Sequence, residues 1–156
     1  DFWAPKGQMN KSDVHSATGE YPLLFGYDLY QYMNGANWTR YARWAHHKGS
    51  AVVVSWWATN PVNGEEAHDC KGDPVTALMP GGKAHKEWMD QLNQVVKFFN
   101  KFQDVDGEQI PVIFRMFREP NTDHWWWGKR CSSPKEYHEA FEFSYNYIQS
   151  RTHNIL

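Results

Sequence analysis

The fold of this chain is set by the apolar stretch AVVVSWW at residues 51–57 and by two stretches of the same kind. These are PLLFGYD at residues 22–28 and PVIFRMF at residues 111–117. Each is a continuous apolar run bounded by turn residues, a pattern typical of strands that are buried on both faces of a parallel sheet. We therefore predict three parallel strands at these positions.

Helical patterns separate the three predicted strands. Apolar residues recur at helical spacing over residues 38–45 and, in a longer stripe, over residues 88–102. A third helix is predicted to begin after Ser133, with Pro134 at its first position and Glu136 completing a capping box. The alternation of strand and helix predicts a parallel α/β fold.

Composition excludes several classes of function. The 16 Lys and Arg residues against 18 Asp and Glu residues give a net charge of −2, which is not the basic footprint of a nucleic-acid partner. No segment approaches the roughly 18 apolar residues of a membrane-spanning helix. The 9 Trp residues and 17% aromatic content fit a protein that stacks sugar rings, with a crowded core as the alternative.

The sequence predicts neither a cofactor nor a metal site. It has no glycine-rich phosphate loop, nucleotide fingerprint or Ser-His-Asp arrangement. His68, Cys70 and His85 do not follow a zinc-binding spacing, and the acidic residues of segment 65–73 lack the order of a calcium-binding loop.

The two cysteines and two sequons favour a secreted protein. Cys70 and Cys131 lie in polar, loop-like segments, whereas free cysteines are usually buried, so a disulfide is favoured over two unpaired thiols. Asn10 and Asn37 begin N-glycosylation sequons, although such tripeptides also arise by chance. Residues 1–18 carry no charged-then-apolar leader and are interpreted as an N-terminal extension or loop, with any leader already removed.

The segment with the most chemical information follows the third predicted strand. Glu119 lies where this strand ends, after Arg118 and ahead of three tryptophans at residues 125–127. Because the carboxyl ends of parallel strands carry the site in α/β folds, the long loops 58–83 and 119–132 are expected on the functional face. Aromatic surroundings favour a protonated Glu119 that can donate a proton, whereas Arg118 favours its ionised form or a simple ion pair at the strand end.

The order of these residues resembles glycoside hydrolase family 26, which is best known for β-mannanases. The resemblance covers residues 19–156, and the segment 111–128 carries it without a gap. It is carried further by Glu20-Tyr21-Pro22, Gly26-Tyr27-Asp28, Ser55-Trp56, Asn60-Pro61, Cys131, Pro134 and Tyr137. The resemblance implies a (β/α)8 TIM-type barrel, of which this chain supplies strands two to four and their helices. It also implies retaining hydrolysis of β-mannan or a related β-linked polysaccharide, with Glu119 as the general acid/base.

The same resemblance indicates which residues contact the substrate, a β-linked polysaccharide or oligosaccharide. The expected contacts are Asp28, Trp57, Arg118, Asn121, His124, Trp125, Trp126 and Trp127. The tryptophans among them are expected to form a stacking platform for sugar rings. With Trp56 they are five of the nine Trp, so the tryptophan excess is expected to belong mainly to this face rather than to a crowded core. For Asp28 a second interpretation stays open, in which it caps the turn that follows its strand.

Three of these positions depart from the family's usual residues. Trp57 and Arg118 stand where the family usually has His, and His124 stands where it usually has a sugar-stacking Trp. Trp125, next to His124, can take over the stacking. The departures leave two interpretations open: a hydrolase with altered specificity, or a catalytically impaired barrel. The impaired barrel would serve as an extracellular glycan-binding or structural module, with other extracellular proteins as further partners.

The length predicts an incomplete barrel. A (β/α)8 barrel takes about 250 residues, whereas this chain has 156. Retaining hydrolysis needs a second carboxylate about 5 Å from the first, and the resemblance places that nucleophile at the end of strand seven, to which no segment here corresponds. We therefore expect residues 1–156 to be the N-terminal portion of a single barrel domain, with the apolar end at residues 153–156 beginning a further strand.

Overall fold

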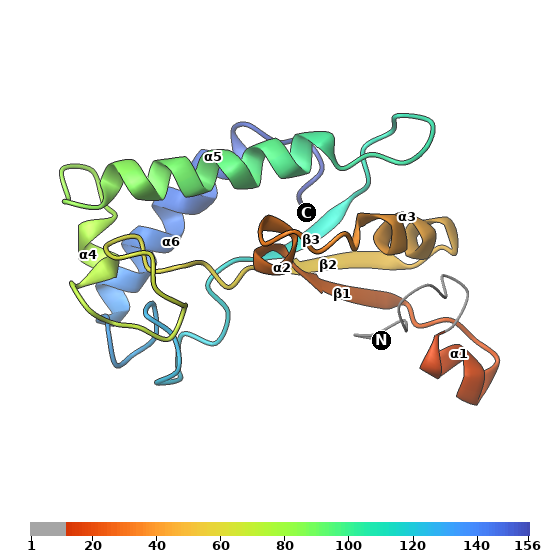
Figure 1. The fold of residues 1–156 in the computed structure, drawn as a ribbon, viewed down its shortest axis with the longest axis horizontal. Helices are drawn as coiled ribbons and strands as arrows, with labels where there is room; N and C mark the ends of the chain where they lie inside the picture. Colours follow the sequence, from red (N-terminus) through yellow and green to blue (C-terminus); the bar gives the residue numbers. More distant parts are fainter. Residues whose placement is uncertain (1–11) are drawn as a thin grey trace.

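The computed structural model describes residues 12–156 as a three-stranded sheet with helices packed against it (Figure 1). Asn10, the first predicted glycosylation site, lies outside the described residues. In chain order the elements are α1 Asp13–Thr18, β1 Leu24–Asp28, α2 Leu29–Met33, α3 Thr39–His47, β2 Ala51–Ser55, α4 Pro74–Ala77, α5 His85–Lys101, β3 Val112–Arg115 and α6 Pro134–Gln149. Within residues 12–156, every helix is too short or too polar to span a bilayer.

The three strands pair in parallel in the order β1-β2-β3, as the sequence predicts. Phe25, Val52 and Val112 share one row of the register. Each strand is shorter than the apolar stretch that predicts it. β3 ends early because Phe117 and Glu119 have backbone φ angles of 51° and 54°. Such left-handed conformations cannot continue a strand ladder.

The three longer helices also match the prediction. α6 begins with the complete capping box, in which the Ser133 hydroxyl accepts a hydrogen bond from the Glu136 amide and the Glu136 carboxylate accepts one from the Ser133 amide. Of the residues interpreted as an extension or loop, 1–18, the structure describes 12–18, where α1 forms. Ser12 caps the start of α1, and Gly19 ends it with a left-handed φ of 80°. Helices as short as α1, α2 and α4 have no room for a periodic apolar pattern.

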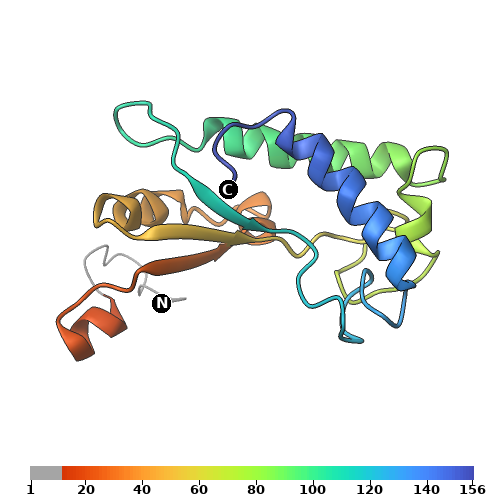
Figure 2. The same cartoon turned by 180° about the vertical axis from the view of Figure 1, so that it is seen from behind.

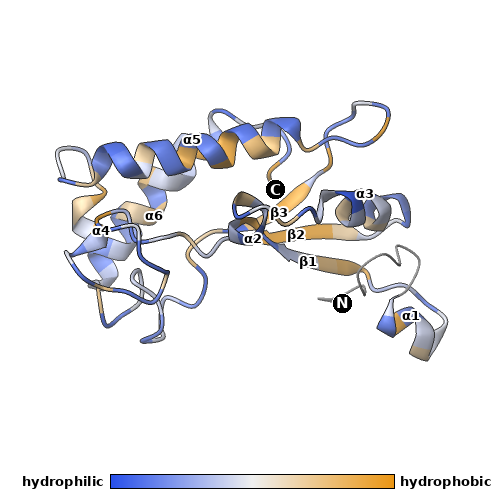
Figure 3. Cartoon of the chain, viewed as in Figure 1, coloured by the Kyte–Doolittle hydropathy of each residue, from blue (hydrophilic) through white to orange (hydrophobic). Residues whose placement is uncertain are grey.

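The helices cover one face of the sheet more completely than the other (Figures 1 and 2). Phe25, Val52 and Val112 point to the covered face and are buried. Leu24 and Ile113, on the opposite face, are 55% and 38% exposed. Figure 3 shows how apolar residues run along β2 and β3. Since a parallel sheet is normally covered on both faces, this sheet leaves one partly apolar face open to solvent.

The end of the chain lies along the edge of β3 but forms no strand of its own in the described residues. Val112 and Ile155 form an isolated parallel bridge. The Val112 amide donates to the Asn154 carbonyl at 2.8 Å, and the Leu156 amide donates to the Val112 carbonyl at 2.9 Å. The last residues therefore begin to pair along the outer edge of β3, on the side away from β2. The complete barrel stays a prediction.

Candidate active site

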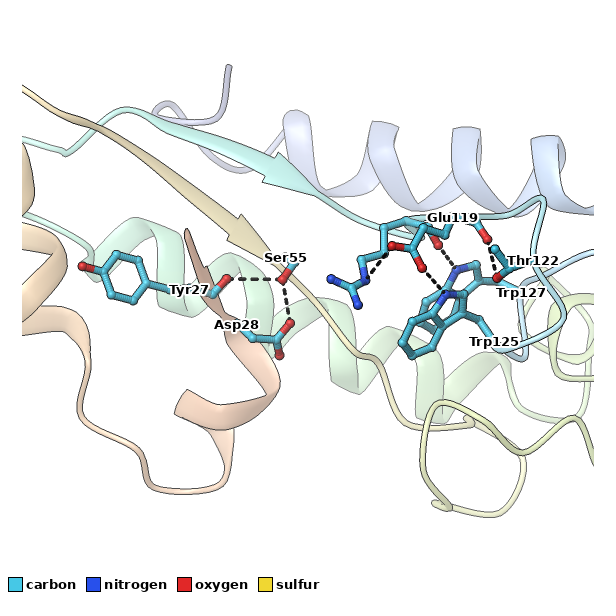
Figure 4. A network of polar contacts seen from close by, with 8 residues as sticks. Tyr27, Asp28, Ser55, Glu119, Thr122, Trp125 and Trp127 are labelled. Carbon is cyan, nitrogen blue, oxygen red and sulfur yellow. Dashed lines mark hydrogen bonds and ion pairs between the residues drawn. The ribbon is translucent and has the colours of Figure 1, made fainter. Parts of the chain in front are cut away.

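Glu119 lies just beyond β3, at the carboxyl edge of the sheet. Its backbone is left-handed, and its carbonyl oxygen accepts hydrogen bonds from the Thr122 amide at 3.1 Å and the Thr122 hydroxyl at 3.0 Å (Figure 4). This conformation is costly for a residue with a Cβ atom and clusters at functional sites. The side chain is 45% exposed, and its Oε2 atom accepts a hydrogen bond from Trp125 Nε1 at 3.3 Å. The carboxylate is therefore oriented through one oxygen and remains accessible to solvent.

Arg118 lies between two indole rings and beside Glu119. The centre of its guanidinium is 5.0 Å from the ring centroid of Trp57 and 5.1 Å from that of Trp125. Its Nε atom is 4.0 Å from Glu119 Oε1, which is an ion pair without a hydrogen bond. Cation–π contacts with the two rings therefore fix the guanidinium, while its pairing with Glu119 is loose.

Trp126 and Trp127 do not form the predicted stacking platform. Their exposed fractions are 0% and 1%. Trp126 packs edge-on against Trp88 and donates from Nε1 to the Ala58 carbonyl at 2.8 Å. Trp127 donates from Nε1 to the Arg118 carbonyl at 2.8 Å. Because a sugar needs a free ring face to stack on, the prediction of substrate contact is wrong for both residues.

The tryptophan excess belongs mainly to the core. Four tryptophans are fully buried: Trp56, Trp88, Trp126 and Trp127. Trp125 is 4% exposed, whereas Trp57, at 37%, is the most exposed tryptophan in residues 12–156. The prediction that the excess belongs mainly to one sugar-binding face is therefore wrong, and a crowded core accounts for most of it.

Asp28 follows the capping interpretation. It is 3% exposed, and its carboxylate accepts a hydrogen bond from the Tyr30 amide at 2.9 Å. It also accepts one from the Ser55 hydroxyl at 2.8 Å (Figure 4). Burial raises the pKa of Asp28, and the hydrogen bonds and the charge of Arg118 oppose this rise. Asp28 thus joins the ends of β1 and β2, at the same edge of the sheet as Glu119.

A hollow in the surface lies beside Trp57. Its lining residues are Tyr30, Trp57, Glu66, Ala67 and His68. The Trp57 ring is tilted by 45° against the Trp125 ring, with centroids 5.6 Å apart, so the hollow borders the aromatic rings around Arg118. The sequence did not indicate Tyr30, Glu66 or Ala67, because they meet only when loop 58–83 folds back toward the end of β1.

His124 and Asn121 are exposed in the loop that follows Glu119. The carbonyl of His124 pairs with His68 Nδ1 at 2.8 Å, and the His68 ring stacks on Trp125 with centroids 4.8 Å apart. His68 therefore links the two long loops at the site, a role that its position in the sequence did not indicate. In the described part of the chain, no three His, Cys, Asp or Glu side chains are grouped to hold a metal ion.

The predicted disulfide between Cys70 and Cys131 is present. It joins the loop after β2 to the loop after β3 across a sequence separation of 61. Close by, the Trp126 amide donates to the Ala67 carbonyl at 2.8 Å and links the same two loops. Together these bonds hold in place the loops that border Glu119.

Comparison with known proteins now decides the family. The sequence pattern of glycosyl hydrolase family 26 matches residues 5–155. The chain belongs to glycosyl hydrolase family 26. A mannan endo-1,4-β-mannosidase from Bifidobacterium adolescentis is 28% identical over 163 residues, which cover 94% of this chain and 16% of that protein.

Solved structures related to this family-26 chain share its fold. A modular endo-β-1,4-mannanase from Cellulomonas fimi has a TM-score of 0.88 at 28% identity, over 99% of this chain and 38% of that one. The catalytic domain of the family-26 endo-β-1,4-mannanase from Bacillus sp. JAMB-750 has a TM-score of 0.86 at 30% identity, over 94% of this chain and 42% of that one. This chain therefore spans less than half of the length of each of these relatives.

Proposed function

We propose that this chain is part of a retaining glycoside hydrolase that cleaves β-mannan or a related β-linked polysaccharide, with Glu119 as the general acid/base. Membership of family 26 and the mannanase names of its relatives support the substrate class. The placement of Glu119 carries the assignment of the residue, because an exposed carboxylate in a left-handed backbone stands at the carboxyl edge of the sheet.

In this proposal Glu119 transfers a proton twice. In the first step its carboxylic acid protonates the glycosidic oxygen of the leaving sugar, and in the second its carboxylate takes a proton from the attacking water. The hydrogen bond from Trp125 Nε1 holds Oε2, and we propose that Oε1, 4.0 Å from Arg118 Nε, carries the transferred proton. We assign no residue of this chain as the nucleophile that forms the covalent intermediate.

Exposed side chains around Glu119 supply the proposed glycan contacts. Trp57 offers a ring face beside the hollow, and aromatic faces stack on sugar rings. Asn121 and His124 are exposed in the loop after Glu119, where their polar groups can bind sugar hydroxyls. Trp125 is proposed to orient Glu119 rather than to stack, since it is 4% exposed.

We also propose that the protein is secreted and glycosylated. A disulfide such as Cys70–Cys131 persists in oxidising compartments and is rare in the cytosol. Asn37 is exposed in the segment between α2 and α3, and its Oδ1 atom accepts a hydrogen bond from the Thr39 hydroxyl of the same sequon at 3.1 Å. The accessible position of Asn37 supports its modification.

A second candidate function is glycan binding without hydrolysis. It is favoured by Arg118, which stands where the family usually has His and whose Nε atom lies 4.0 Å from Glu119 Oε1. In this case the protein would bind β-linked oligosaccharides but release no reducing ends from them.

Substitution of Glu119 in the full-length protein tests the proposal. Glu119→Gln should lower the rate of mannan hydrolysis by about 10²–10⁴-fold, the usual contribution of a general acid/base. Glu108→Gln is the matched control, because Glu108 is exposed in the turn before β3, at the opposite edge of the sheet. A Glu119→Gln enzyme as active as the control would reject the role of Glu119, and binding without any hydrolysis by the unmodified protein would favour the second candidate.

A further inference from the structure

The Glu119 carboxylate depends on one indole for its orientation. Within residues 12–156, Trp125 Nε1 is the one group that donates a hydrogen bond to this carboxylate, at 3.3 Å from Oε2 (Figure 4). Arg118 forms only an ion pair with it, with Nε 4.0 Å from Oε1. A distance of 3.3 Å is long for an N–H···O hydrogen bond, so a small turn of the indole would break it. The position of the Trp125 ring therefore decides how the carboxylate is held.

Two stacked rings fix Trp125 in turn. The first is Trp127 of the same loop, with centroids 5.3 Å apart and an angle of 3° between the planes. Trp127 is 1% exposed and belongs to the core. The second is His68 of loop 58–83, with centroids 4.8 Å apart and an angle of 21°. His68 is exposed, whereas Trp125 is 4% exposed, so an exposed ring from a different loop covers the indole that orients Glu119.

His68 restrains the loop of Trp125 at two points. Its ring stacks on the indole, and its Nδ1 atom lies 2.8 Å from the carbonyl oxygen of His124, the residue before Trp125. A carbonyl oxygen only accepts hydrogen bonds, so we assign the ring proton to Nδ1. One side chain therefore holds both the ring of Trp125 and the backbone that leads into it.

The backbone on either side of His68 is fixed as well. The Ala67 carbonyl accepts a hydrogen bond from the Trp126 amide at 2.8 Å, and Cys70 is joined to Cys131 by the disulfide. His68 thus stands on a segment that is already tied to loop 119–132. Its ring loses little conformational freedom by staying on Trp125, which makes it a preorganised support.

We propose that His68 is a positioning residue, which holds Trp125 so that the indole orients the Glu119 carboxylate for proton transfer. The inference rests on the proposed function of Glu119 and adds to it a residue from the other long loop. Without His68 the indole can turn away and Oε2 loses its donor. Fewer enzyme–substrate complexes would then hold the carboxylate in the orientation that proton transfer needs, and a misplacement of about 1 Å can lower a rate by about 100-fold.

Direct contact with a sugar is the competing role for His68. Its side chain lines the hollow beside Trp57, where it could bind a substrate hydroxyl. The two roles differ in their kinetics. A contact made equally with the substrate and the transition state raises KM when it is lost, whereas lost orientation of the acid lowers kcat.

Kinetics of His68 variants of the full-length protein test the inference. His68→Ala should lower kcat on mannan by about 10–100-fold and change KM by no more than about twofold. His68→Phe, which keeps a flat ring for Trp125 but not the hydrogen bond, should recover part of the lost kcat. His138→Ala is the control, because His138 is exposed on α6, and it should leave kcat unchanged. Denaturant unfolding verifies that each variant is folded under the assay conditions.

The leaving group of the substrate separates positioning of the acid from a general disturbance of the site. His68→Ala should lose more activity on mannan than on an activated aryl β-mannoside, because a good leaving group needs little help from an acid. Three outcomes would each overturn the inference: a raised KM with unchanged kcat, equal losses of kcat on both substrates, or a His68→Phe enzyme no faster than His68→Ala.

Glu119→Gln decides the proposed function separately. Equal losses on mannan and on the aryl β-mannoside in Glu119→Gln would remove the acid role of Glu119 itself. A selective loss on mannan in Glu119→Gln that is missing in His68→Ala would reject only the positioning role of His68.

Discussion

Two groups of residues around the tryptophan-rich loops differ in their exposure to solvent. The core cluster is fully buried and consists of Trp56, Trp88, Trp126 and Trp127. The open edge consists of Trp57, Arg118, Glu119 and Trp125, of which Trp57 and Glu119 are exposed. Neighbouring tryptophans in one segment are therefore divided between structure and site.

The core cluster supports the open edge through its polar atoms. Trp127 donates to the carbonyl of Arg118, and Trp126 donates to the carbonyl of Ala58, next to Trp57. Buried indoles thus fix the backbone on both sides of the site, while the side chains of the open edge remain available to a ligand. A tryptophan-rich loop can thus be fixed by buried rings and still present exposed side chains.

Loss of a core-cluster ring is expected to have the largest effect. Trp126→Ala should lower the free energy of unfolding by about 3–5 kcal/mol, because it leaves a cavity and an unpaired Ala58 carbonyl. Trp57→Ala, at an exposed position, should lower it by about 1 kcal/mol or less. Denaturant unfolding of the two variants measures the contrast, and similar losses would remove the distinction between the two groups.

The disulfide ties the loops of both groups together. Replacement of Cys70 and Cys131 by Ala should lower the free energy of unfolding by about 3–4 kcal/mol, since the bond closes a long loop. Thermal unfolding of the double variant measures this effect. Non-reducing mass analysis of the unmodified protein is the control, and free Cys70 and Cys131 thiols in it would end the claim.

The affinity for sugars should depend on the open edge more than on the core cluster, the reverse of what is expected for stability. Trp57→Ala should weaken the binding of manno-oligosaccharides roughly tenfold, because it removes an exposed stacking face, and Trp57→Phe should keep part of the affinity. Tyr145→Ala is a control, as Tyr145 is 45% exposed on α6 and should leave affinity unchanged. Unaltered calorimetric affinity in Trp57→Ala would show that the open edge does not stack sugars.

Asp28 is buried like the core cluster, although it lies at the same edge of the sheet as the residues of the open edge. Because burial raises the pKa of Asp28, the folded protein binds this proton more tightly than the unfolded chain. The contribution of this proton to the free energy of unfolding is therefore fully present below the pKa of Asp28 in the unfolded chain, about 3.9. It is lost as the pH rises through the higher pKa of Asp28 in the folded protein. The Asp28→Asn variant should not show this loss of stability with rising pH, because its amide does not titrate. Unfolding between about pH 3 and pH 7 measures it, and identical pH profiles would contradict the assignment.

The strands and the helix caps could be predicted because their signals are local. The capping box of α6 needs only Ser133 and Glu136, three residues apart, and each strand is a short apolar run. The cysteine pairing was predicted from the polar character of the two loops and is confirmed.

The orientation of the tryptophans could not be predicted in this way. Trp125, Trp126 and Trp127 lie in a loop without periodicity, and their burial depends on partners such as Ala58 and Ala67, distant in the sequence. The left-handed backbone of Glu119 gives no sequence signal either, since no glycine marks it. Both features arise only from tertiary contacts.

The role of Glu119 as proton donor is tested most directly by the leaving group of the substrate. Glu119→Gln should reduce hydrolysis of mannan far more than hydrolysis of an activated aryl β-mannoside, because a good leaving group needs little help from an acid. The ratio of the two rate reductions, measured on the full-length protein, is the decisive quantity. The reduction on mannan divided by the reduction on the aryl β-mannoside is predicted to be well above one. Equal losses on both substrates would contradict the account.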